Sequence, residues 1–317
     1  MGTNTEIPIE NDHNPDRLLE RHGKSFHWAR YFLGKEAAKK ATRLYAFCRY
    51  LDDIADDTQY DNQDELLDIK NSLNSASNLD DKDPRIESFK KLHKIVNFNL
   101  SAVDDLIDGL ITDQKDVCIN NEELLIQYAY QVAGTVGLMM ASILNAQSKR
   151  AFPFAIDLGI AMQLTNIARD VLEDAENHRR YIPGVFCNDM PPKEILAGAF
   201  DNDLLTREII KSSINQILHI AEKYYDSGLL GLSYLPVRNH LAIGIAAIIY
   251  RQIGRKLLKK GTQWWTGRQV VGIFEKLIYS FLVIPALFNR LKTLPEHDPT
   301  LHIPLKRFLH VNSNHQQ

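Results

Sequence analysis

Residues 35–57 read KEAAKKATRLYAFCRYLDDIADD, and this stretch decides the fold class. Its apolar residues recur at steps of three and four, which is the period of an α-helix with one buried face. The same period returns along most of the chain, while Gly and Pro are sparse and fall mainly between the periodic segments. No alternating, strand-like pattern of useful length occurs. We therefore expect an all-α protein, built as a single-domain helical bundle with a central cavity.

The periodic segments give the expected order of elements. Helices are predicted over 35–56, 64–73, 86–98, 101–112, 121–146, 154–174, 203–225 and 241–260, with a last helical region over 267–291. The proline-containing stretch 180–193 and the stretch 235–238 are expected to be loops. We expect an all-α domain over 18–295, between a polar N-terminal tail (1–17) and a polar C-terminal tail (296–317).

Charge and cysteine content exclude several classes of protein. The 317 residues include 37 basic and 40 acidic side chains, a formal charge of −3, so nucleic acid is not expected as the main partner. Three widely spaced cysteines without a CxxC pair fit neither a disulfide framework nor a zinc site, which favours a reducing, cytoplasmic setting. The polar N-terminus does not resemble a signal peptide, and no apolar run reaches the roughly 18 residues of a membrane-spanning helix.

The first acidic cluster ends the helix quoted above. Asp52 and Asp56 are four residues apart, so their carboxylates lie on one helix face. Like charges at this spacing destabilise a helix unless a cation lies between them. Taken alone, the cluster is equally typical of a solvated, acidic helix end.

The second cluster lies in the stretch QLTNIARDVLED, residues 163–174. Steps of three, four and four place Gln163, Asn166, Asp170 and Asp174 on one polar stripe of an otherwise apolar helix. Buried carboxylates are costly unless they are hydrogen-bonded or bind a metal, and oxygen ligands of this kind suit Mg²⁺, with Mn²⁺ as a substitute. A buried ion-pair network around Arg169 is the alternative interpretation.

Together the two clusters predict a reaction. If both acidic faces line one cavity, they can hold two or three Mg²⁺ ions that bind a diphosphate. Arg49 and Arg169 accompany the clusters and are suited to bidentate contact with diphosphate oxygens. Departure of the diphosphate would leave a carbocation in a dry apolar pocket. No P-loop motif occurs in the sequence.

Four ordered blocks carry a specific resemblance. They are HGKSF (22–26), YAFCR leading to DDIAD (45–56), YAYQVAGTVG (128–137), and the second acidic cluster continuing to RRYIP (163–183). Weaker matches are DLIDG (105–109) and AAIIYR (246–251). In these blocks the sequence resembles the squalene/phytoene synthase family of head-to-head prenyl transferases, over about residues 22–251, and most of all its bacterial, phytoene-forming members.

The resemblance implies an isoprenoid synthase fold with both acidic helices facing one cavity. It implies metal ligation by Asp52, Asp56, Asn166, Asp170 and Asp174. It further implies contacts to the diphosphates of two prenyl substrates from His22, Ser25, Tyr45, Arg49, Gln163, Arg169 and Tyr250, with Asn166 close by. Tyr130 is expected in the catalytic cavity, with Tyr128 in the core.

The implied reaction joins two geranylgeranyl diphosphates, through prephytoene diphosphate, to phytoene without NADPH. Squalene, dehydrosqualene or presqualene diphosphate synthesis from two farnesyl diphosphates is the closest alternative. A non-catalytic prenyl-lipid-binding or assembly protein and a class I terpene cyclase rank lower, because both acidic clusters and the block 128–137 are intact.

Two features left alternatives open at the level of sequence. Gly134 and Gly137 permit close helix packing or leave room for a prenyl tail. Peripheral attachment to the inner face of a membrane is suggested by the oily substrates, with Trp264, Trp265 and the basic run 255–260 as candidate surfaces. Buried indoles and a solvated basic face are the plainer interpretations. The oligomeric state cannot be derived from these patterns.

Overall fold

The computed structural model describes residues 28–57, 62–74, 83–114, 116–201, 203–269, 271–287, 290 and 293–308. Within these ranges all regular elements are helical, and the one isolated β-bridge joins Cys118 to Arg180. The expected all-α, single-domain fold is confirmed. The longer helices are α3 (Lys35–Asp56), α4 (Gln63–Asn74), α5 (Pro84–Val96), α6 (Leu100–Asp113), α7 (Glu122–Ala129), α8 (Thr135–Ile143), α9 (Phe152–Arg169), α12 (Pro192–Phe200), α13 (Leu204–Gly231), α14 (Val237–Lys259) and α15 (Ile273–Phe281).

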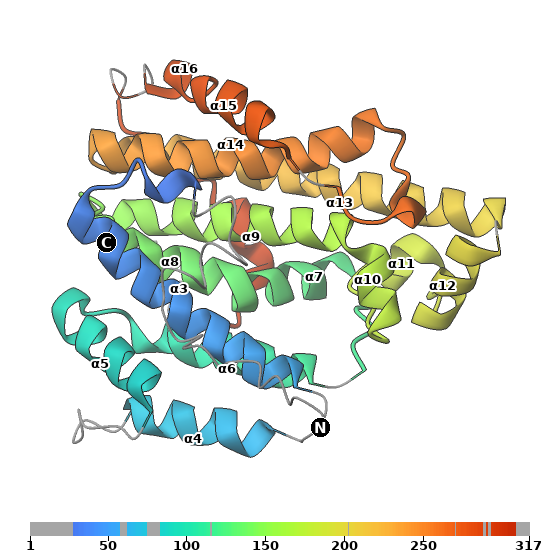
Figure 1. Cartoon of the computed structure of the whole chain (residues 1–317), viewed down its shortest axis with the longest axis horizontal. Coiled ribbons are helices and arrows are strands. Elements are labelled where there is room, and N and C mark those ends of the chain that lie inside the picture. Colours follow the sequence, from blue (N-terminus) through green and yellow to red (C-terminus); the bar gives the residue numbers. More distant parts are fainter. Residues whose placement is uncertain are drawn as a thin grey trace, which may run out of the picture.

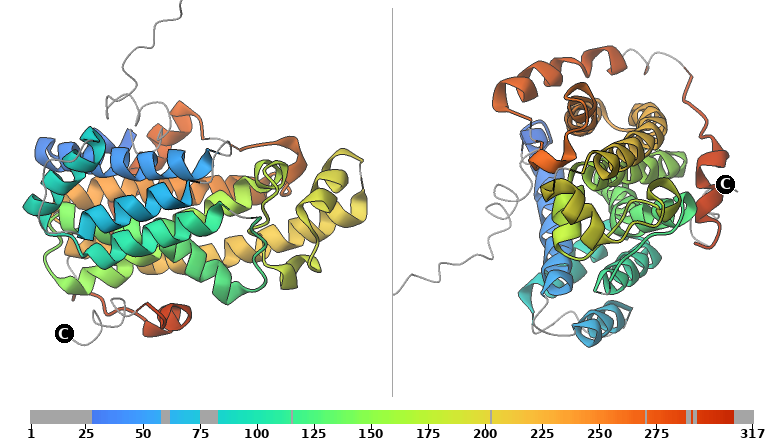
Figure 2. Two further views of the ribbon diagram at one scale, coloured as in Figure 1. Left: turned by 90° about the horizontal axis from the view of Figure 1, so that it is seen from below. Right: turned by 90° about the vertical axis from the view of Figure 1, so that its right-hand side faces the viewer.

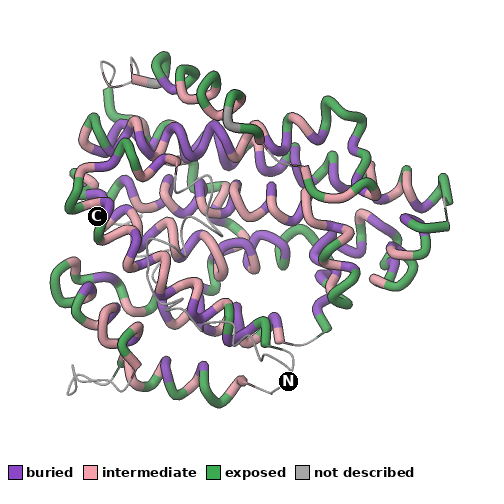
Figure 3. The backbone as a smooth tube through the Cα atoms, in the orientation of Figure 1, coloured by how far each residue is buried: buried purple, intermediate pink, exposed green. Residues whose placement is uncertain are grey.

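Helix α9 forms the centre of the bundle. It contacts α8, α13 and α14, and it runs between them in Figure 1. Apolar side chains on several of its faces, including Phe154, Ile156 and Ala161, are buried. Because an α-helix that is apolar on most faces must be surrounded by other elements, the central position follows from the composition of this segment. Figure 3 shows the same helix as one of the most buried parts of the backbone.

Helices α3 to α6 cover the side of the bundle that lies opposite α13 and α14 (Figures 1 and 2). The Phe47 ring of α3 stacks on the Phe89 ring of α5, with 3.9 Å between ring centroids. Leu44 and Leu51 of α3 are fully buried. The apolar face of α3 therefore lies in the core, and its acidic C-terminal end lies beside α6 and α9.

Two glycines allow α8 and its preceding turn to touch α9 backbone to backbone. A Cβ atom on Gly137 would lie 2.2 Å from the Ala155 carbonyl oxygen, and one on Gly159 would lie 2.3 Å from the Ala133 carbonyl oxygen. Neither position can accept a side chain without moving a helix. Close packing is thus one role of Gly137, which also lines an apolar cavity described below.

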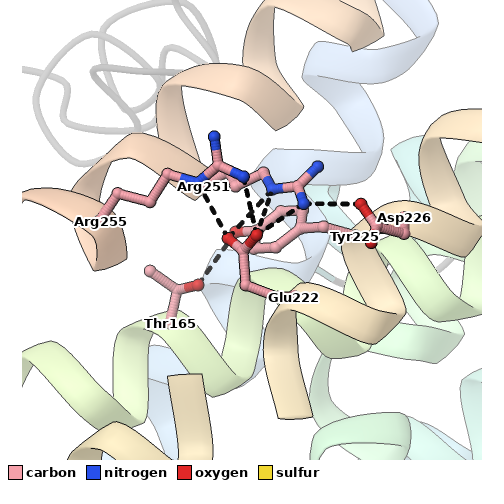
Figure 4. Close-up of polar contacts among 6 residues, drawn as sticks. All are labelled: Thr165, Glu222, Tyr225, Asp226, Arg251 and Arg255. Atoms are coloured by element: carbon pink, nitrogen blue, oxygen red, sulfur yellow. Dashed lines mark hydrogen bonds and ion pairs between the residues drawn. The ribbon is translucent and has the colours of Figure 1, made fainter. Parts of the chain in front are cut away.

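Ion pairs fix α14 to α13 on the outer side of the bundle (Figure 4). Arg251 donates to Glu222 and to Asp226, each over 2.6 Å, and Arg255 donates to Glu222 over 2.8 Å. Below this network the hydroxyls of Tyr225 and Thr165 are 3.0 Å apart, which ties α13 to α9.

Three expected helices are interrupted. The segment 121–146 contains a π-helical turn, η1 (Tyr130–Gly134), between α7 and α8. The segment 154–174 breaks at Asp170 into α9 and α10 (Val171–Glu176). The last helical region begins later than expected, as α15 and the short α16 (Ile284–Leu287). The expected loop 180–193 contains a helical turn, α11 (Gly184–Cys187), and the first residues of α12.

The C-terminal segment corrects the expected boundary at residue 296. Residues 299–305 form a short 3-10 helix, η6 (Pro299–Leu305), and Leu305 is fully buried. The Gln127 side chain of α7 donates to the Pro304 carbonyl over 2.8 Å. Within 296–308 the chain is therefore packed on the bundle and is not a free polar tail, because it carries apolar residues that fill a gap beside α7 and α9.

Two segments are long and apolar enough to cross a membrane by length and composition alone, Glu122–Ile143 and Lys149–Arg169. Both segments contain polar or charged residues, so neither is the unbroken apolar run that the sequence analysis looked for. The more buried of the two, which includes α9, has 72% of its most apolar stretch inside the protein, as expected of a core helix.

Candidate active site

The two acidic clusters meet at one cavity. It has a volume of about 240 Å³ and lies between the C-terminal end of α3, the end of α6, and the α9–α10 junction. Its wall includes Asp52, Asp56, Asp113, Tyr128, Gln163, Asn166, Asp170, Asp174, Arg179 and Tyr181. The structure thus brings together all five expected metal ligands and Gln163. We call this space the acidic cavity.

The break at Asp170 keeps the polar stripe on one side. Asp170 has φ −102° and ψ 15°, outside the regular helix, yet its backbone N–H still donates to the Asn166 carbonyl over 2.9 Å. The Asp174 N–H in turn donates to the Asp170 carbonyl over 2.8 Å. Because the four-residue hydrogen bonds span the break, Asn166, Asp170 and Asp174 remain aligned along the cavity.

Carboxyl groups from both sides have raised pKa values. Burial raises the pKa of Asp52 to about 7, and nearby Asp56 raises it further against the lowering effect of Arg49. Burial also raises the pKa of Asp174 to about 8, with added repulsion from Asp170 and Glu173. Desolvated carboxylates that repel each other favour either a bound proton or a bound cation.

Arginines offset part of this negative charge. Arg49 pairs with Asp53 over 2.5 Å on the exposed side of α3. The Arg169 Nε donates to Asp170 over 2.6 Å, and Arg268 lies 3.2 Å from the same carboxylate. The ion pairs expected under the alternative interpretation of Arg169 are therefore present, and Asp170 also lines the cavity. The two features coexist.

Arg179 bridges the two clusters. Its guanidinium lies 3.2 Å from the Asp56 carboxylate. Its positive charge also opposes the rise that burial causes in the pKa values of Asp113 and Asp174. It stands in the quoted block 163–183, but the sequence pattern assigned no role to this arginine. The missing signal is spatial, because Arg179 follows α10 by three residues and reaches back across the cavity to α3.

Asp113 is a second residue that sequence reasoning missed. Its carboxylate accepts hydrogen bonds from the hydroxyls of Tyr128, over 2.7 Å, and Tyr181, over 2.9 Å. Burial nevertheless raises the pKa of Asp113 to about 6. The two rings stack with centroids 4.7 Å apart, so they hold this acid firmly in the cavity wall.

The structure exchanges the expected positions of two tyrosines. Tyr128 lines the acidic cavity, whereas Tyr130 is fully buried and donates to Asp105 over 3.0 Å. The Tyr130 ring packs on Phe308, with 4.6 Å between centroids. Tyr130 opens the π-helical turn, and of the two tyrosines it is Tyr128 that lines the acidic cavity.

The remaining expected diphosphate ligands lie at the edge of this site. Tyr45 of α3 and Tyr250 of α14 are half-buried, and burial raises the pKa of both, that of Tyr45 to about 12. Tyr250 contributes to the raised pKa of Tyr45, and Tyr250 itself lies near Arg169, Arg268 and Asp170. His22 and Ser25 lie outside the described residues.

An apolar cavity of about 120 Å³ lies further along the bundle, between α8, α9, α13 and α14. Its wall is almost wholly apolar and includes Val136, Met140, Phe154, Leu158, Met162, Leu232 and Ile243. Met162 directly precedes Gln163 of the acidic cavity, and Val136 follows Val132 of that cavity by one helical turn. The two cavities thus lie next to each other along the same helices. One is lined mainly by charged and polar side chains, and the other by apolar side chains.

Asn166 tests whether the acidic cavity fits a hard divalent cation. Its amide nitrogen donates to the Gln163 side chain over 3.2 Å, while its buried Oδ1 accepts no hydrogen bond from the described residues. An oxygen without a donor, beside desolvated carboxylates, is the donor set that Mg²⁺ or Mn²⁺ prefers. The residues present fit such an ion.

A second group of residues that could bind a metal lies where α9 meets the C-terminal segment. Asp157, His297 and His302 hold their ligand atoms within 4.8 Å of one another. Each histidine Nε2 lies 2.8 Å from one Asp157 oxygen, and Ser227 donates to the same carboxylate over 2.5 Å. Hydrogen bonds from His297 and His302 outweigh the effect of burial and lower the pKa of Asp157. These contacts make the group a clamp that holds the C-terminal segment.

Comparisons with known proteins agree on one family. The family model described as squalene/phytoene synthase matches residues 19–274. The chain is 31% identical to a 15-cis-phytoene synthase of Enterobacter agglomerans over 269 residues, which covers 82% of this chain and 90% of the relative. It is 34% identical to a phytoene synthase of Thermus thermophilus over 295 residues, covering 89% and 95%. Among solved structures, a dehydrosqualene synthase with bound ligand superimposes with a TM-score of 0.72 at 24% identity, covering 86% of this chain and 95% of that chain.

Proposed function

The chain belongs to the squalene/phytoene synthase family and is a prenyltransferase, and from this premise we propose that it condenses two geranylgeranyl diphosphates head to head to phytoene. The bond forms between the two C1 carbons, and prephytoene diphosphate is the proposed intermediate. The two relatives described above are phytoene synthases, which favours the C20 substrate.

The observation that carries the proposal is the meeting of two acidic clusters beside an apolar cavity. Asp52 and Asp56 come from α3, and Asn166, Asp170 and Asp174 come from the α9–α10 junction, more than 100 residues later in the chain. Raised pKa values of Asp52 and Asp174 indicate a site that is short of positive charge. A diphosphate is itself negative, so a cation must accompany it.

We propose that these five residues hold Mg²⁺, which Mn²⁺ can replace. When bound, the ion neutralises charge on the departing diphosphate and so lowers the barrier to ionisation. The ion pairs of Arg49 with Asp53 and of Arg169 with Asp170 keep both guanidinium groups near the site. We propose that they exchange these partners for diphosphate oxygens, assisted by Tyr45, Gln163 and Tyr250.

The protein must also protect the allylic cation from water. The apolar cavity begins one helical turn from the acidic cavity, so a prenyl tail that enters it leaves its C1 carbon at the charged end. The stacked rings of Tyr128 and Tyr181 line the acidic cavity, and aromatic faces stabilise cations. Exclusion of water there favours attack by the second substrate's double bond over hydrolysis.

The test supplies purified protein with C15 or C20 prenyl diphosphate, with and without Mg²⁺ and with and without NADPH. We expect a C40 hydrocarbon from the C20 substrate, two diphosphates released for each product, and dependence on Mg²⁺ but not on NADPH. A dominant C30 product would contradict phytoene synthesis and would support the farnesyl diphosphate alternative, which is the reaction type of a dehydrosqualene synthase such as the structural neighbour.

The same experiment addresses a prenyl-lipid-binding protein. Such a protein would bind prenyl diphosphates but release no diphosphate from either substrate under any condition. Both acidic clusters line the cavity here, which favours catalysis over binding alone.

A further inference from the structure

Helices α15 and α16 carry an exposed apolar surface on the outside of the bundle. In Figures 1 and 2 these helices lie over α14, away from the core, and Figure 3 shows them largely exposed. The exposed side chains are Phe274, Leu277, Ile278, Phe281, Leu282 and Ile284. Phe274, Leu277, Ile278 and Phe281 follow the i, i+3, i+4, i+7 pattern of one helix face. We call this set the α15 face.

The opposite side of the same segment is anchored to the protein. Glu275 pairs with Lys256 of α14 over 2.8 Å and accepts from the Gly272 N–H over 2.7 Å. Val283 is buried against Ile245, Ile248 and Ile249 of α14. The helix is thus fixed in an orientation that turns its apolar face outward. Exposed apolar patches of this kind mark interaction sites.

Charge identifies the partner. Residues 251–287 contain seven basic side chains and one acidic side chain in a chain whose formal charge is −3. Arg251 and Arg255 are engaged by Glu222 and Asp226 (Figure 4), and Arg268 lies beside Asp170, but Lys259 and Lys260 are exposed near the start of α15. An apolar helix face with basic residues beside it fits the surface of an anionic lipid bilayer.

A second exposed apolar patch differs from the α15 face in the charge of the residues around it. Phe200, Leu204 and Leu205, at the turn between α12 and α13, are 70%, 71% and 70% exposed. Residues 193–208 around them contain four acidic and two basic side chains. Anionic lipid would be repelled there, so exposure alone does not select the α15 face.

The apolar cavity lies close to this face. A Cβ atom on Gly244 of α14 would lie 2.3 Å from Val283 and 3.3 Å from Leu232. Leu232 lines the apolar cavity, and so does Ile243, which precedes Gly244 in the chain. A bilayer at the α15 face would therefore contact the protein next to the cavity that the proposed function assigns to oily tails.

We propose that the α15 face is a docking surface for an anionic lipid bilayer, with its apolar side chains inserted among the acyl chains and the adjacent lysines at the head groups. Trp264 is buried and donates to the Arg207 carbonyl over 3.3 Å, so it is not part of the surface. Docking does not depend on the proposed reaction, because it is measured without substrate.

The test is co-sedimentation of the full chain with vesicles of phosphatidylcholine containing about one third phosphatidylglycerol. The variant Phe274→Ser/Ile278→Ser/Phe281→Ser should lower the partition coefficient by about 100-fold or more. The matched control Phe200→Ser/Leu204→Ser/Leu205→Ser removes side chains of similar exposure and should bind like the wild type. The variant Lys259→Gln/Lys260→Gln should weaken binding by about fivefold for each charge, with no such loss on pure phosphatidylcholine.

Helical content by circular dichroism and turnover of detergent-dispersed substrate should be unchanged in all three variants. The proposal is overturned if the wild-type chain does not bind the vesicles, or if both triple-serine variants lose binding equally. It is also overturned if light scattering shows a dimer that the α15-face variant dissociates while vesicle binding is absent, because the face would then belong to a second copy of the chain.

Discussion

The two ends of helix α9 adjoin buried carboxylates with opposite properties. Near its N-terminal end, Asp157 is fully buried but accepts hydrogen bonds from Ser227, His297 and His302, and its pKa is lowered. At its C-terminal end, the acidic cavity holds Asp170 and Asp174 opposite Asp52. There the pKa values of Asp52 and Asp174 are raised to about 7 and about 8.

The difference separates structure from function. A buried carboxylate whose hydrogen bonds are complete lowers the free energy of the fold and needs no ligand. Carboxylates that are desolvated and close to one another raise the free energy of the folded state. Such groups are found mainly where a bound ligand compensates their negative charge. We therefore assign the Asp157 clamp to stability and the acidic cavity to catalysis.

The largest expected effect is on turnover. Asp52→Ala or Asp170→Ala should lower the rate of C40 product formation by at least about 1,000-fold, because each removes a proposed cation ligand. Helical content should be nearly unchanged, since these side chains do not fill the core. Either variant that retains turnover would remove that residue from the proposed metal site.

Asp157→Asn should show the reverse pattern. The amide cannot accept from all three donors and carries no charge, so the free energy of unfolding should fall by about 3 kcal/mol. Turnover measured well below the melting temperature should change less than tenfold. Urea unfolding checks the first expectation. A variant as stable as the wild type but inactive would contradict the division of roles.

The pH dependence of stability should differ between the two sets. A carboxyl group with a raised folded-state pKa binds more protons in the folded state, so its contribution weakens the fold as pH rises. From the values for Asp52 and Asp174, the metal-free protein should lose stability as pH rises from about 4 to about 8, on the order of 5 °C in melting temperature.

Mg²⁺ should suppress this loss, because cation binding replaces the protons. Asp157 has the opposite sign: its stabilisation is complete above the ordinary aspartate pKa and disappears only in acid, as pH falls through its lowered folded-state pKa. Calorimetry with Mg²⁺ and with a chelator checks both trends. A metal-free protein whose stability rises toward pH 8 would contradict the raised pKa values.

The smallest effect is expected for Ser227→Ala, which removes one of three donors to Asp157 and leaves the histidines in place. The free energy of unfolding should fall by about 1.5 kcal/mol, with turnover unchanged. A loss as large as that of Asp157→Asn would show that the serine, and not the histidines, supports the clamp.

Much of the fold was predictable, because the apolar period of 35–56 and of 154–169 reflects burial along a whole helix. The break at Asp170 and the π-helical turn at Tyr130 were not, since they depend on packing against neighbouring helices. The acidic cavity is lined by Tyr128, whereas Tyr130 begins the π-helical turn and donates to Asp105, an arrangement that the sequence pattern did not predict.

The meeting of the two acidic clusters at one cavity was predictable, because each set repeats at helical spacing within one segment. Asp113 ends α6, whereas Arg179 and Tyr181 follow α10, and none of the three repeats at helical spacing with either acidic cluster. The Asp157 clamp was hidden for the same reason: its histidines follow 140 and 145 residues later, in a segment that reads as a polar tail.

Cation binding tests the central claim most directly. Mn²⁺ can be titrated by electron paramagnetic resonance into the wild-type protein with a non-reactive prenyl diphosphate analogue, and into the Asp170→Ala and His302→Ala variants. The account predicts tight Mn²⁺ binding to the wild type and to His302→Ala, and its loss in Asp170→Ala. Binding that survives in Asp170→Ala but disappears in His302→Ala would place the metal at the clamp and contradict the account.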